Sequence, residues 1–171
     1  MISGRPAFYR RQQWRPMTAD RAPRNRSRQV RILVIEDDAD ICSICEHIFT
    51  WAGHEVAAAL DGKPGLELVE SFEPDVIALD IMMPGVDGLT VLAELRGSVL
   101  TRDIPVVVVS ARTLNADRLR AFEAGADDYV SKPFDPNVLL RVLERACHGS
   151  PEERAAWRQQ EMRSLRVESY P

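Results

Sequence analysis

Short apolar runs rich in β-branched residues alternate along this chain with segments whose apolar residues recur at helical spacing. The expected strands are Val30–Ile35, Glu55–Leu60, Val76–Leu79, Ile104–Val109 and Asp127–Val130. A helical pattern follows each of them, the last over Pro136–Cys147. Because right-handed crossovers place helices on both faces of a parallel sheet, the alternation predicts an α/β fold with a doubly wound, five-stranded parallel sheet.

Charge divides the chain into three parts. Residues 1–28 carry eight Arg and one Asp and show no periodic apolar pattern, so we expect a disordered leader. Residues 29–148 carry ten basic and twenty-one acidic side chains and have room for one globular domain. Residues 149–171 are neutral overall and predict a short polar helical tail. The acidic domain and the small tail lead us to expect no DNA-binding domain.

Cysteine content and hydropathy indicate the compartment. No apolar run approaches the roughly 20 residues that span a bilayer, so we expect no membrane partner. Three cysteines do not make a disulfide framework, and free thiols favour a cytoplasmic location. Cys42 and Cys45 have the C-x-x-C spacing of some metal and redox motifs, but their apolar helical neighbours favour core positions.

Charged and hydroxyl residues stand where the expected strands end. Glu36 and Asp37 follow the first strand, Asp80 the third, Ser110 the fourth, and Lys132 lies just beyond the fifth. Ligands bind at the carboxyl ends of strands in such open sheets. Three converging carboxylates repel one another unless a cation lies among them, and oxygen ligands suit Mg²⁺ better than Zn²⁺. Any one of these acidic residues could instead be a helix N-cap.

Four segments, ILVIEDD, PDVIALDIMMPGVDGL, IPVVVVSA and DDYVSKPF, resemble those of receiver domains from two-component response regulators. The resemblance covers residues 29–148 and includes the order and separation of the segments. It implies the flavodoxin-like receiver fold, and because the tail is too small for a DNA-reading domain we expect a stand-alone, single-domain response regulator.

The same resemblance implies a role for each matching residue. Asp80 matches the phosphoacceptor, Glu36 and Asp37 match the acidic pair that holds Mg²⁺, and the backbone carbonyl of Met82 matches a further magnesium ligand. The remaining roles fall to Ser110 as the hydroxyl that binds the phosphoryl group, Lys132 as its paired cation, Tyr129 as the aromatic switch residue, and Pro133 as a proline after a cis peptide bond.

Two further observations bear on these roles. Lysine occupies only two of the twenty-two basic positions, Lys63 and Lys132, so its presence at the motif position favours a specific role over that of an ordinary surface cation. Met82 and Arg112 match the positions that tune hydrolytic water, and neither is suited to hold one. We therefore expect a phosphorylated state that lasts minutes or longer.

The implied function is a phosphorelay switch. A histidine kinase or phosphotransfer protein would phosphorylate Asp80, and the switch would act without being an enzyme in its own right. An unknown downstream protein would bind the surface formed by the helix that carries Leu119 and Phe122, the strand Asp127–Val130 and the helix Pro136–Cys147; a homodimer is also open. The alternatives are a phosphorylation-independent scaffold with a vestigial site, and a magnesium-dependent phosphatase. Such phosphatases carry a second Asp where Met82 stands.

Overall fold

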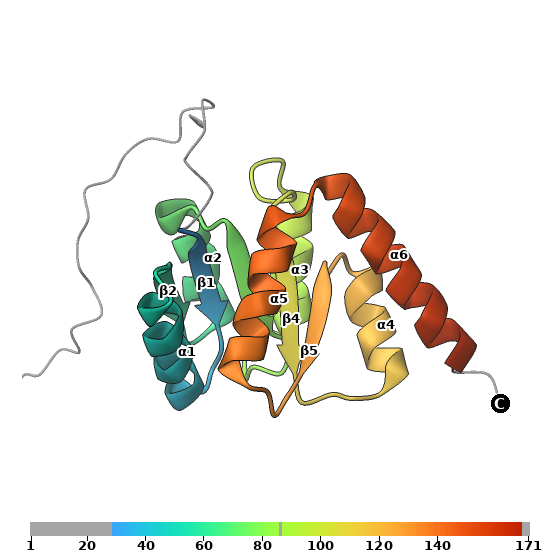
Figure 1. Cartoon of the computed structure of the whole chain (residues 1–171), viewed down its shortest axis with the longest axis horizontal. Helices are drawn as coiled ribbons and strands as arrows, with labels where there is room; N and C mark the ends of the chain where they lie inside the picture. Colours follow the sequence, from blue (N-terminus) through green and yellow to red (C-terminus); the bar gives the residue numbers. More distant parts are fainter. Residues whose placement is uncertain (1–28, 86, 169–171) are drawn as a thin grey trace, which may run out of the picture.

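Five parallel strands form one sheet in the order β2–β1–β3–β4–β5 (Figure 1). The computed structural model describes residues 29–85 and 87–168, so the leader predicted over residues 1–28 lies outside the described residues. The strands are β1 (Arg31–Ile35), β2 (Glu55–Ala59), β3 (Val76–Asp80), β4 (Val106–Ser110) and β5 (Asp128–Ser131). The doubly wound sheet predicted from the sequence is therefore confirmed.

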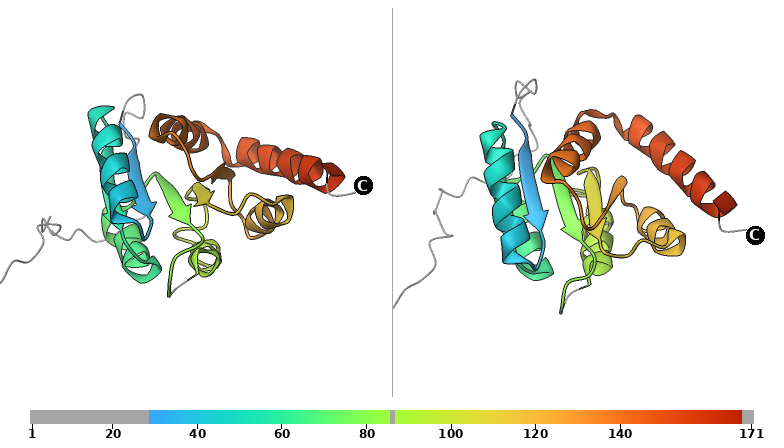
Figure 2. Two further views of the ribbon diagram at one scale, coloured as in Figure 1. Left: turned by 90° about the horizontal axis from the view of Figure 1, so that it is seen from below. Right: turned by 60° about the horizontal axis from the view of Figure 1, so that its bottom comes forward.

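Helices cover both faces of this sheet (Figures 1 and 2). They are α1 (Ala39–Trp51), α2 (Gly62–Phe72), α3 (Gly88–Gly97), α4 (Asn115–Glu123), α5 (Pro136–His148) and α6 (Pro151–Glu168). Buried side chains of α1 and α5 pack on one face of the sheet, and those of α2, α3 and α4 pack on the other. None of the helices in the described ranges is long and apolar enough to span a bilayer.

Alternation along the strands explains why the sheet has two cores. In β1, Ile32 and Val34 join the core under α1 and α5, whereas Leu33 and Ile35 join the core under α2, α3 and α4. Successive side chains of a strand point to opposite faces, so a central strand must be apolar throughout. The continuous apolar run in the sequence has this physical origin.

An aspartate stands at the N-cap of four helices, and in three of them its side chain accepts backbone hydrogen bonds. Asp38 accepts hydrogen bonds from the backbone of Asp40 and Ile41 at the start of α1. Asp87 and Asp135 act in the same way at the starts of α3 and α5. The N-cap alternative raised for Glu36, Asp37 and Asp80 does not hold, because other residues cap α1 to α5.

The polar tail forms α6, which lies alongside α4 (Figures 1 and 2). Leu165 is buried in the core cluster that also holds residues of α3 and α4, and Met162 packs against that cluster. The sequence pattern predicted this helix but not its position on α4, because a helix without a continuous apolar stripe does not indicate the surface on which it packs.

Candidate functional site

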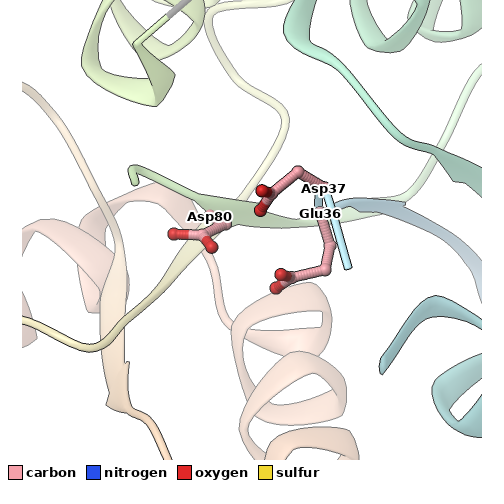
Figure 3. Close-up of side chains that lie close together, drawn as sticks. All are labelled: Glu36, Asp37 and Asp80. Carbon is pink, nitrogen blue, oxygen red and sulfur yellow. The ribbon is translucent and has the colours of Figure 1, made fainter. Parts of the chain in front are cut away.

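Three carboxyl groups gather at the carboxyl ends of the two central strands β1 and β3 (Figure 3). One ligand atom from each of Glu36, Asp37 and Asp80 lies within 4.8 Å of the other two. Glu36 and Asp80 are buried, each with 3% of its surface exposed, whereas Asp37 is open to solvent. The neighbouring register of β1 and β3 creates this approach, because Ile35 pairs with Leu79 and the acidic residues follow directly.

Lys132 enters the same cluster from the end of β5. Its Nζ lies 2.6 Å from Glu36 Oε1 and 2.6 Å from Asp80 Oδ2, so one ammonium bridges two buried carboxylates. Burial opposes its charge, but the hydrogen bonds to Asp80 and Glu36 outweigh that effect and raise the pKa of Lys132. Burial also raises the pKa of Glu36, against the opposing hydrogen bond from Lys132. Two of the three acidic groups, Glu36 and Asp80, thus share one protein cation.

The loop after β3 holds the Asp80 carboxylate in place. The backbone N–H of Met82 donates to Asp80 Oδ1 at 2.7 Å, which leaves Oδ2 for Lys132. Gly88, at the start of α3, lies so close to this loop that a Cβ there would be 2.1 Å from the carbonyl oxygen of Asp80. Sequence analysis missed this contact, although the run PGVDG after Met83 is a signal for a tight loop.

Ser110, Arg112 and Tyr129 form a connected group beside the acidic cluster. The buried Ser110 Oγ accepts a hydrogen bond of 3.1 Å from the backbone N–H of Arg112. The hydroxyl of Tyr129 donates to the carbonyl oxygen of Arg112 at 2.6 Å. The backbone of Arg112 therefore links the hydroxyl of Ser110 on β4 to the aromatic ring of Tyr129 on β5. The side chain of Arg112 forms an ion pair of 3.1 Å with Asp117.

The structure also shows where the other residues singled out in the sequence lie. The Lys132–Pro133 peptide bond is cis, and the side chain of Met82 is 47% exposed beside the acidic cluster. Cys42 and Cys45 are buried free thiols on α1, and the Cys42 thiol donates to the carbonyl oxygen of Glu36. Burial raises the pKa of Cys42 to about 12 and that of Cys45 to about 11, so both stay protonated and unsuited to redox chemistry.

The sheet is open and parallel, with paired acidic residues after its first strand and an Asp and a Lys at other strand ends. These features define a doubly wound α/β domain with an acidic cleft at the carboxyl ends of its strands. A family model described as "Response regulator receiver domain" matches residues 32–144. This chain belongs to that family.

Known proteins of the family resemble the chain over the same segment. It is 43% identical over 125 residues to the DNA-binding dual master transcriptional regulator RpaA of Synechocystis. The matched segment covers 71% of this chain and 52% of RpaA. A response regulator structure from Chloroflexus aurantiacus matches with a TM-score of 0.67 and 30% identity, covering 71% of this chain and all of that one.

A third match concerns the metal. The receiver domain of sensor histidine kinase PA1611 from Pseudomonas aeruginosa has a TM-score of 0.64 and 29% identity, covering 71% of this chain and 99% of that one. That structure is described with a magnesium ion coordinated in the active site cleft. Glu36, Asp37 and Asp80 offer an all-oxygen donor set of the kind that Mg²⁺ prefers, so these residues fit the ion.

The comparisons correct one expectation. The sequence predicted no DNA-binding domain, so we expected DNA not to be among the partners. That expectation is wrong, since RpaA is a DNA-binding transcriptional regulator. The chain spans about half the length of the curated relatives it matches. The expectation rested on the acidic charge of the receiver segment and on the small size of the tail. Neither carries information about the parts of these relatives that lie outside the matched segment.

Proposed function

We propose that Asp80 of this chain accepts a phosphoryl group from a histidine kinase or a phosphotransfer protein in a two-component system. The observation that carries the proposal is the convergence of Asp80 with two other carboxylates and with Lys132 at adjacent strand ends. The receiver unit comprises residues 29–148. Its free thiols agree with a cytoplasmic protein.

Each group in the cluster has a part in the transfer. An oxygen of Asp80 attacks phosphorus, the bond to the donor breaks as the new bond forms, and the product is an acyl phosphate. The transition state is loose and carries negative charge on its equatorial oxygens, so the protein acts mainly by positioning and charge stabilisation. The Met82 N–H orients the Asp80 carboxylate by donating to its Oδ1. Lys132 places a positive charge beside Oδ2, the other oxygen of the same carboxylate.

The metal would be held by the side chains of Glu36, Asp37 and Asp80 together with the backbone carbonyl of Met82. A magnesium ion bound there would supply positive charge against the negative charge of the donor and of the transferred group. Glu36 and Asp80 are buried, so their orientation is fixed before the ion arrives, whereas the exposed Asp37 can adjust to it.

The phosphorylated state would be read by Ser110 and Tyr129. A phosphoryl group adds nearly two negative charges and new acceptor oxygens beside the Ser110 hydroxyl. When Ser110 donates to one of these oxygens, it leaves the position in which it accepts from the Arg112 N–H. The carbonyl oxygen of Arg112 holds the Tyr129 hydroxyl, so the change reaches the aromatic ring.

Intact-mass measurement tests the phosphoacceptor directly. The full chain is incubated with acetyl phosphate or phosphoramidate and Mg²⁺, and we expect a single phosphoryl adduct that is lost in Asp80→Asn. Asp103→Asn is the matched control, since it makes the same chemical change at an exposed carboxylate and should keep the adduct. The absence of any adduct at every donor concentration would favour the phosphorylation-independent scaffold.

The same adduct gives the lifetime of the acyl phosphate. Met82 is exposed beside the site and the Arg112 side chain is paired with Asp117, so neither holds a hydrolytic water at the phosphoryl group. After removal of the donor we expect the adduct to persist for minutes or longer. Loss within seconds would contradict this assignment of Met82 and Arg112.

A further inference from the structure

The first half of α6, residues 151–158, is fixed to the start of β5 and to α5. Arg154 and Arg158 both face the carboxylate of Asp127, at 3.5 and 3.7 Å. The Trp157 ring lies under the guanidinium of Arg145 on α5, 4.7 Å from its centroid. We call residues 151–158 the anchor half. Its contacts involve α5 and the amino-terminal end of β5, which is the end of the sheet opposite the acidic cluster.

The second half of α6, residues 159–168, lies on α4, and we call it the docking half. Glu161 pairs with Arg118 of α4 at 3.6 Å, and Arg166 pairs with Glu123 of α4 at 3.0 Å. Leu165 adds a buried apolar contact, with 3% of its surface exposed. The Glu161–Arg118 pair is partly buried, whereas the Arg166–Glu123 pair is largely exposed.

Arg118 connects the docking half to the site. Its guanidinium lies over the Tyr129 ring, 5.8 Å from the centroid, while it pairs with Glu161 of α6. The hydroxyl of the same tyrosine donates to the carbonyl oxygen of Arg112, whose N–H donates to Ser110 Oγ. An unbroken series of contacts therefore runs from the end of β4 beside the phosphoacceptor to α6.

We propose that phosphorylation of Asp80 weakens the hold of the docking half on α4, and that Tyr129 and Arg118 transmit the change. The inference rests on the proposed function for its trigger, but its route is defined by contacts of its own. When Ser110 turns to the phosphoryl group, Arg112 and the Tyr129 hydroxyl lose their present positions. The ring then leaves Arg118, which loses the contact that directs it to Glu161. The anchor half makes none of these contacts and stays in place.

Hydrogen exchange of the full chain tests the proposal. Exchange is followed by mass spectrometry in peptides from residues 151–158 and 159–168, with and without acetyl phosphate and Mg²⁺, and intact mass of the same sample reports phosphorylation. We expect exchange in the docking half to rise roughly three- to tenfold, the effect of one cation–π contact and one ion pair. The anchor half should not change. An intact adduct with unchanged exchange in the docking half would overturn the inference and leave the proposed function standing.

Two charge variants separate the proposed route from a general loosening of α6. Glu161→Gln removes the pair with Arg118, so exchange in its docking half should be faster from the start and should respond little to phosphorylation. Glu123→Gln is the matched control, because it removes an ion pair between the same two helices that has no contact with Tyr129. It should keep the full response. If phosphorylation raises exchange in the docking half equally in the two variants, the proposed route through Arg118 is wrong.

A third comparison is independent of phosphorylation. Tyr129→Leu removes the ring under Arg118 while filling much of its space, and it should raise exchange in the docking half of the unphosphorylated protein. Tyr129→Phe keeps the ring and serves as its control for loss of the hydroxyl alone. If Tyr129→Leu leaves the docking half as protected as in the unsubstituted chain, the route fails even where no phosphoryl adduct forms.

Discussion

Asp127 is a buried carboxylate that three guanidinium groups share. Arg96 donates to its Oδ2 at 2.9 Å, Arg154 and Arg158 face its Oδ1, and the backbone N–H of Val106 also donates to Oδ2 at 2.9 Å. This one side chain therefore joins α3, the start of β4, the start of β5 and α6. Asp127→Asn keeps the shape of the side chain and removes its charge.

The cost of that change depends on whether Arg96 can escape to water. Its Nε donates to the carbonyl oxygen of Gly125 and its Nη1 to those of Arg102 and Ile104, so the guanidinium stays where it is after the carboxylate is neutralised. Burial already lowers the pKa of Arg96. Removing one partner of a buried ion pair costs about 3–5 kcal/mol, and the partial exposure of the pair places the expected loss near 3 kcal/mol. That corresponds to a drop of roughly 10 °C in Tm.

Urea unfolding followed by circular dichroism measures this loss, with the Tm as a second readout. Asp103→Asn is the matched control, since Asp103 is exposed and its only ion pair within the described residues is a 4.0 Å contact with Arg102. We expect less than about 0.5 kcal/mol for that control. A loss below about 1 kcal/mol in Asp127→Asn would refute the reasoning, because Arg96 would then be stable without its carboxylate.

Three other perturbations test the loop after β3, the metal ligands and the buried thiols. Gly88→Ala should cost about 1–3 kcal/mol in urea unfolding, because its Cβ would meet the carbonyl oxygen of Asp80 at 2.1 Å; an unchanged midpoint would contradict the contact. Mg²⁺ should raise the Tm by linkage, and Asp37→Asn should shift that titration to higher Mg²⁺, so coincident titration curves would remove Asp37 from the ligand set. Cys42 and Cys45 have raised pKa values of about 12 and 11, so the fold favours neutral thiols that ionise at lower pH when unfolded. Their contribution to stability should be complete below about pH 8.5 and lost as the pH rises toward 11, which a flat series of urea midpoints across that range would refute.

The strands could be predicted because burial on both faces leaves a direct mark on the sequence. Val106, Val107, Val108 and Val109 are all buried, and a short β-branched run of this kind is typical of a parallel strand covered by helices on both sides. Strand ends are marked equally well by the first polar residue, so Asp80 and Ser110 were correctly placed at the edge of the sheet. Convergence of the site follows from topology alone once β1 and β3 are neighbours.

The contacts of Arg118 could not be predicted in the same way. A lone Arg on a polar helix has many solvent-exposed conformations, and nothing in its local sequence selects Tyr129 or Glu161 as a partner. The contact with Tyr129 arises only after α4 has packed beside β5, and the contact with Glu161 only after α6 has packed on α4. Asp127 is similar, because its partners come from α3 and α6 on either side of it in sequence.

The composition of α6 explains why its docking half is suited to respond to a small change. Leu165 is its fully buried hydrophobic residue, and burying one such side chain contributes about 2–3 kcal/mol. The two ion pairs to α4 are partly or largely exposed and add about 1 kcal/mol or less each. The docking free energy is therefore only a few kcal/mol, so a loss near 1 kcal/mol at Arg118 changes the undocked population severalfold. A strand such as β4, with every side chain buried, would barely respond to a change of that size.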